Sequence, residues 1–246
     1  MNGLYHLGRY LFLMRKVFGR GEKRRVFWHQ VVDEFNQLGT GSLWIVLIIS
    51  VFMGAVVAIQ ISFNVDSPLL PRYTVGYITA QSIILEFSPT ILGLILAGKV
   101  GSRISSEIGT MRVTEQIDAL EIMGINSAHH LILPKVVAAL FANPLLIVIS
   151  MFLGIAGGWA AVTLTGIYSA EDYIFGIQSY FEPMQVIYAL TKTVIFAFLI
   201  TSISGYHGYY TSGGALEVGK ASTRAVVTSC IMIIVFNLIL TQLFLG

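Results

Sequence analysis

The stretch that decides the fold is ISSEIGTMRVTEQIDALEIMGI, residues 104–125, a polar segment in an otherwise apolar chain. It contains three Glu, one Asp and one Arg. Gly109 is expected to weaken one helix, Thr114 to cap the next, and Gly124 to end it. The sequence therefore predicts a short, capped helix over residues 115–123.

The predicted helix has an acidic face. Glu115 and Asp118 lie one turn apart, Glu121 continues their row, and Gln116 lies beside them in the first turn. Acidic groups in a first helical turn interact favourably with the helix dipole. A solvated surface helix has the same pattern, but a capped helix between two apolar segments is also suited to contact a partner protein.

The composition of the chain is that of an integral membrane protein. Of its 246 residues, 55% are hydrophobic and only 11% are charged, and the mean hydropathy is +0.77. Soluble domains have about 25% charged residues. Too few charges remain to cover a water-facing surface, and a net charge of +2 gives no indication of a nucleic-acid partner.

Five apolar runs are long enough to cross a bilayer, which takes about 20 residues in a helix. They cover residues 42–63, 75–97, 134–164, 184–204 and 225–245. The preceding residues 1–41 are amphipathic, and we expect two helices that lie in the membrane interface, joined by a turn at residues 19–25. The prediction is an all-α integral membrane protein with this N-terminal unit at 1–41, a five-span domain at 42–246 and the short polar helix between two spans.

The basic residues predict the orientation. Five spans place residues 1–41, 98–135 and 205–224 on one side of the membrane, and these segments hold thirteen of the fifteen Lys and Arg residues. The positive-inside rule then places the N-terminus and the polar helix in the cytoplasm and the C-terminus outside. The acidic segment 165–183, which has no Lys or Arg, agrees with an external location.

Two charged residues lie inside predicted spans. Glu86 is in the second span, three residues before Pro89, and Lys192 is in the fourth. Each costs roughly 2.5–3.5 kcal/mol at the centre of a bilayer, so such residues face a partner or a cavity. They either pair and hold the bundle together or line a substrate path, and Pro89 is expected to kink its span.

Another motif argues against a function. Gly93, Gly98 and Lys99 have the spacing of a phosphate-binding loop, but residue 100 is Val, where that motif has the Ser or Thr that binds Mg²⁺. We therefore expect no nucleotide hydrolysis by this chain, no enzymatic activity, no cofactor and no metal site. Gly154 and Gly158 have the GxxxG spacing of closely packed membrane helices.

Three blocks of sequence carry a family resemblance: EFSPTILGLIL (86–96), AGKVGSRISSEIGTMRVTEQIDALEIMGI (97–125) and GGALEVGKASTRAVV (213–227). They resemble the MlaE (YrbE) family of ABC-transporter permeases, which serve MCE-protein lipid transport systems, and the resemblance covers nearly the whole chain. In these permeases the segment EQIDAL corresponds to the coupling helix that contacts the ATPase. The resemblance thus makes Glu115, Gln116, Asp118 and Glu121 the candidates for that contact.

The resemblance also implies the partners and the location. It implies a homodimer in the bacterial inner membrane, a cytoplasmic ABC ATPase subunit, a periplasmic MCE protein and a phospholipid moved between inner and outer membranes. Many members have Arg before the Glu that matches Glu86, whereas this chain has Leu85, so a lipid phosphate would need another cation such as Lys192. Two alternatives stay open: an ion-coupled carrier or channel that uses Glu86 and Lys192, and a membrane anchor for the MCE protein.

Overall fold

The structure is a computed structural model that describes residues 2–19, 24–65, 71–179 and 181–245. In these residues every regular element is helical. In chain order they are α1 (Asn2–Val17), α2 (Arg24–Asn64), α3 (Thr74–Ser82), the π-helix η1 (Ile83–Ile91), α4 (Leu92–Leu96), the π-helix η2 (Ala97–Gly101), α5 (Ser102–Val113), α6 (Gln116–Ile122), α7 (Ser127–Leu164), α8 (Ala170–Ser179), α9 (Pro183–Tyr209) and α10 (Ala215–Leu245).

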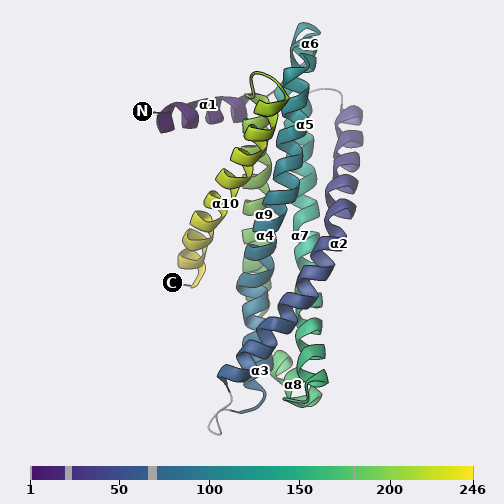
Figure 1. The fold of residues 1–246 in the computed structure, drawn as a ribbon, viewed down its shortest axis with the longest axis vertical. Coiled ribbons are helices and arrows are strands. Elements are labelled where there is room, and N and C mark those ends of the chain that lie inside the picture. The colour runs from purple at the N-terminus through teal and green to yellow at the C-terminus, as the bar shows by residue number, and fades with distance from the viewer. Residues whose placement is uncertain (1, 20–23, 66–70, 180, 246) are drawn as a thin grey trace.

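Five helical segments of the described chain are long and apolar enough to cross a membrane, which confirms the predicted fold class. They are α2, the continuous segment Thr74–Val113 that runs from α3 to α5, α7, α9 and most of α10. Figure 1 shows these segments side by side as a bundle, with α6 at one end, α8 at the other, and α1 projecting to one side, roughly perpendicular to the bundle, near the α6 end.

The observed helices are longer than the predicted spans. The second amphipathic helix expected before residue 42 is the first part of α2, which continues through Gly39 and Gly41. Each interior glycine costs up to about 1 kcal/mol, but Leu38 and Ser42 are buried on either side of them. Packing therefore outweighs local propensity. The turn predicted at 19–25 falls largely on residues 20–23, outside the described residues.

The polar segment differs from the prediction at Thr114. Gly109, which was expected to weaken a helix, lies inside α5, where an added Cβ would be 3.2 Å from a methyl group of Val218. Thr114 does not cap the next helix, because its hydroxyl donates to the carbonyl of Thr110. The N-cap of α6 is Glu115, and the helix spans 116–122 rather than 115–123.

Glycines bring α2 and α7 into backbone contact, as the GxxxG spacing predicted. A Cβ added to Gly54 would lie 1.8 Å from the carbonyl oxygen of Gly154, and one added to Gly157 would lie 2.3 Å from that of Val51. Without side chains at these positions the two longest helices can approach closely, and van der Waals packing stabilises the pair in lipid.

Candidate functional site

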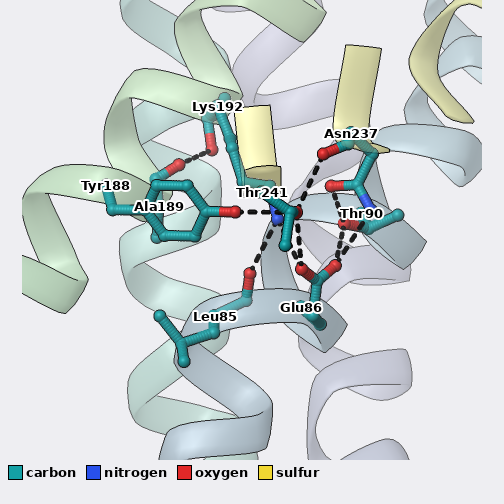
Figure 2. A network of polar contacts seen from close by, with 9 residues as sticks. Leu85, Glu86, Thr90, Tyr188, Ala189, Lys192, Asn237 and Thr241 are labelled. Carbon is teal, nitrogen blue, oxygen red and sulfur yellow. Dashed lines mark hydrogen bonds and ion pairs between the residues drawn. The ribbon is translucent and has the colours of Figure 1, made fainter. Parts of the chain in front are cut away.

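The two charged residues of the spans meet inside the bundle. The Lys192 Nζ of α9 lies 2.6 Å from Oε1 of Glu86 in η1, and 4.6 Å from the ring centroid of Tyr188. Figure 2 shows both side chains directed toward each other. Lys192 is fully buried, whereas the Glu86 side chain is 41% exposed. The pairing left open by the sequence is therefore formed, and the carboxylate stays accessible from one side.

Pro89 explains why the lysine lies where it does. A proline has no N–H, so the carbonyl of Leu85, four residues earlier, lacks its usual α-helical donor. The Lys192 ammonium donates to this carbonyl at 3.1 Å. The expected disturbance at Pro89 takes the form of the π-helical turns of η1 within a continuous helical segment, and π-helical turns are frequent at functional sites.

Helix α10 completes the network through residues that the sequence analysis missed. Asn237 donates its side-chain amide to Glu86 Oε2 at 3.1 Å, and Thr241 donates to Oε1 at 3.3 Å. Thr90 lies 3.0 Å from Oε2, and Tyr188 contacts the hydroxyl of Thr241 at 2.9 Å. The signal was present, because Asn237 and Thr241 are polar residues one helical turn apart in an apolar span.

This network, which we call the Glu86 network, links η1, α9 and α10 (Figure 2). In this arrangement the ammonium of Lys192 is engaged by Glu86, Leu85 and Tyr188. In the Glu86 network several hydrogen-bond donors surround one carboxylate, and this arrangement holds η1, α9 and α10 together.

The predicted coupling residues lie at the α6 end of the bundle, in two groups. Glu115 and Gln116 are exposed, and Glu115 has the left-handed backbone angle φ 61° at the corner between α5 and α6. A non-glycine residue pays roughly 1–2 kcal/mol for this conformation. Asp118 is half exposed and forms an ion pair with Arg112 at 2.6 Å.

Glu121 faces partly inward. Tyr209 and Ser127 each donate a hydrogen bond to its Oε1 at 2.9 Å, and they contact each other at 2.9 Å. These hydrogen bonds, first that of Tyr209 and then that of Ser127, lower the pKa of the Glu121 carboxyl below its usual value. The contacts join α6 to the start of α7 and the end of α9.

The exposed tip of α6 is apolar as well as acidic. Ile122 is 87% exposed and Met123 is 66% exposed, and Ala119 is exposed beside them. The sequence analysis missed this feature because it followed the acidic row only. The surface offered by α6 thus combines Glu115 and Gln116 with an apolar patch.

Nothing in the described chain suggests a catalytic centre. No group of three or more His, Cys, Asp or Glu residues could hold a metal ion within the searched, described residues. The run that resembles a phosphate-binding loop, Gly93–Val100, is helical throughout, as part of α4 and η2. A backbone wound into a helix has no free N–H groups to cradle phosphates.

Five of the described helical segments are long enough to cross a membrane, the Glu86 network lies inside their bundle, and the exposed helix α6 lies at one end. This is the architecture of the membrane-embedded subunit of a transport system. The comparisons give the particular family. The family model described as Permease MlaE matches residues 31–243, so the chain belongs to this permease family.

Known relatives agree with this assignment. The chain is 38% identical over 223 residues to a probable ABC transporter permease protein of Rickettsia bellii, covering 89% of this chain and 84% of the relative. It is 29% identical to the intermembrane phospholipid transport system permease protein MlaE of Haemophilus influenzae, over 98% and 92% of the two chains. It is 30% identical to the chloroplastic protein TRIGALACTOSYLDIACYLGLYCEROL 1 of Arabidopsis thaliana, over 90% of this chain and 63% of that protein. The resemblance is confirmed, and the chain is a multi-pass permease rather than an enzyme.

Proposed function

We propose that this chain is the permease subunit of an ABC-type transporter that moves phospholipid between two membranes. The observation that carries the proposal is α6, a short helix between two membrane-length segments, fixed from behind by Tyr209 and Ser127 and exposing Ile122 and Met123. A permease without nucleotide-binding machinery needs such a surface to receive force from an ATPase. The phospholipid substrate is inferred from the name of the Haemophilus relative.

The proposed assembly follows the family. Two copies of the chain lie in the bacterial inner membrane, each with α6 in the cytoplasm on an ABC ATPase, and an MCE protein lies against the periplasmic end that bears α8. The distribution of Lys and Arg supports this orientation. The N-terminus is then cytoplasmic, the C-terminus periplasmic, and α1 lies along the cytoplasmic interface.

In the proposed mechanism α6 moves first and the Glu86 network responds. ATP binding closes the ATPases, and α6 follows them. Because α6 is tied to α5 by the ion pair of Asp118 with Arg112, its displacement moves the helical segment that carries Glu86. Opening and closing of the Glu86 network between η1, α9 and α10 then changes the shape of the lipid path.

The test separates docking from folding. We expect Glu115→Lys and Ile122→Asp to reduce co-purification of the ATPase and to abolish ATP-dependent lipid transfer between membranes, while thermal stability stays unchanged. Glu171→Lys in α8, exposed at the opposite end of the bundle, is the matched control and should leave ATPase binding intact. Normal ATPase binding and transfer in both α6 variants would refute the assignment.

A further inference from the structure

A second exposed corner lies at the α6 end of the bundle, where α9 ends and α10 begins (Figure 1). We call residues 211–218 the α9–α10 corner. Every residue from Ser212 to Leu216 is exposed, and Leu216 itself is 74% exposed. The proposed mechanism uses no residue of this corner.

The α9–α10 corner is packed against α5, the helix that leads into α6. A Cβ added to Gly109 of α5 would lie 3.2 Å from a methyl group of Val218 and 3.4 Å from the hydroxyl oxygen of Thr211. These two residues are buried at the two ends of the corner. Gly109 is four residues from Val113, the last residue of α5, or about 6 Å along the helix. The exposed part of the corner therefore lies next to the proposed docking surface on α6.

The α9–α10 corner and the corner before α6 have the same construction. Each contains a residue with a positive φ that turns the chain sharply, Gly213 with φ 112° and Glu115 with φ 61°. Each is followed by a helix with an exposed aliphatic side chain, Leu216 in α10 and Ile122 in α6. Both corners thus present an apolar side chain beside a sharp change in chain direction.

Leu216 lies outside the hydrocarbon in the proposed orientation. The apolar run of α10 begins at Ala225, nine residues after Leu216, or about 14 Å along the helix. Lys220 and Arg224 lie between these two residues and are exposed, as is usual for basic residues on the cytoplasmic side of a span. Because lipid tails do not extend to this level, the exposed leucine is available to a protein partner.

Helix α6 alone is small for a stable protein interface. A standard interface takes about 800 Å² and roughly 20–30 residues on each partner, whereas α6 has seven residues. A patch of that area is roughly 30 Å across. A subunit that docks on α6 with an interface of this size therefore also reaches the α9–α10 corner.

We propose that the α9–α10 corner is a second docking surface for the ATPase subunit, with Leu216 inserted into an apolar pocket of that subunit. This inference rests on the proposed function, because it takes the ATPase to be docked on α6. The ATPase then holds two helices that meet in the Glu86 network. Through α6 it holds the segment that carries Glu86, and through the corner it holds α10, which carries Asn237 and Thr241.

Photo-crosslinking in membranes that contain the complete transporter tests this contact directly. The photoreactive residue p-benzoylphenylalanine at position 216 should give a product with the combined mass of the chain and the ATPase. The matched control is position 164, because Leu164 is 87% exposed at the end of α7 that lies away from α6, and it should give no such product. Products at position 216 that contain only lipid or a second copy of the chain would overturn the proposal.

Binding measurements with the purified ATPase separate this contact from the contact at α6. Leu216→Asp should raise the Kd of the ATPase at least about tenfold, as expected when one fully buried leucine is lost from an interface. Gly214→Phe places a ring in open space, so it leaves the fold intact and should also raise the Kd. Leu164→Asp is the control and should leave the Kd unchanged.

The same measurements distinguish failure of this inference from failure of the proposed function. If Ile122→Asp weakens ATPase binding and neither corner variant does, the second docking surface is refuted and the proposed function stands. If none of these three variants weakens binding, both are refuted.

Discussion

Replacing Glu86 by Gln should destabilise the protein more than replacing Lys192 by Met, although both changes break the same ion pair. The reason is the asymmetric burial of the two side chains, since Lys192 is fully buried and Glu86 is 41% exposed. In the Glu86→Gln variant the ammonium stays in the bundle without an anionic partner, and has only neutral neighbours, the new amide, the Leu85 carbonyl and the Tyr188 ring. In the Lys192→Met variant the carboxylate keeps the hydrogen bonds from Asn237, Thr90 and Thr241.

The expected magnitudes follow from this difference. A buried charge that loses its partner costs about 3–5 kcal/mol of unfolding free energy, which is the expectation for Glu86→Gln. A charge that keeps several hydrogen bonds costs less, about 1–3 kcal/mol, which is the expectation for Lys192→Met. The double variant removes both charges and should be close to Lys192→Met alone, so the two single effects should fail to add by the whole Glu86→Gln effect, about 3–5 kcal/mol.

Equilibrium unfolding in mixed detergent micelles, followed by far-UV circular dichroism, measures these differences. Glu171→Gln is the control, because this residue is exposed on α8 and its substitution should change the unfolding free energy by less than about 0.5 kcal/mol. Equal losses in the two single variants, or a double variant equal to their sum, would show that Lys192 does not depend on Glu86 for its burial.

Three further outcomes can be measured. Gly54→Leu should prevent accumulation of folded protein in the membrane, since even a Cβ there would lie 1.8 Å from a backbone oxygen of α7, whereas Gly98→Ala, with open space around it, should be tolerated. Glu121 has a lowered pKa, so its hydrogen bonds stabilise α6 above the usual carboxyl pKa and are lost as pH falls through the lowered one. The protection factors of the α6 amides, corrected for intrinsic exchange, should therefore fall with acidification, and Tyr209→Phe should shift this fall to higher pH. Glu115→Gly should raise the unfolding free energy by about 0.5–1 kcal/mol, because glycine relieves the left-handed strain at a smaller entropic cost.

The fold class was predictable because it depends on length and composition. A bilayer requires about 20 apolar residues per crossing, and the five apolar runs meet that requirement without any knowledge of contacts. The helix ends were less predictable. Gly39 and Gly41 have the local chemistry of a break, but α2 continues through them because Leu38 and Ser42 are buried against the bundle. The helix α8 escaped prediction because its ten residues are too short for a span.

The candidate site was predictable one residue at a time but not as a network. Glu86 and Lys192 were recognisable because a charge in a span is costly, but they are 106 residues apart, and their contact depends on how η1 packs against α9. The inward hydrogen bonds of Glu121 depend in the same way on Tyr209, which lies 88 residues further along the chain. Periodicity places residues on a face of one helix, and only packing decides what that face meets.

The Glu86 network lies on the continuous helical segment Thr74–Val113, and the end of this segment carries Arg112, the ion-pair partner of Asp118 in α6, which indicates how the two candidate sites communicate. From Glu86 to Arg112 the segment is about 39 Å long at 1.5 Å per residue. Its α6 end is fixed to the rest of the bundle, because the buried Lys135 of α7 contacts Glu107 at 2.8 Å and also Glu34 of α2. A displacement of α6 therefore moves α5, α7 and α2 together, while the hydrogen-bond pattern of the segment changes only in η2 and η1. We expect the segment to adjust in these π-helical turns, so amide exchange in residues 83–91 should change when the ATPase binds nucleotide. Unchanged exchange in these residues would show that the Glu86 network takes no part in coupling to the ATPase.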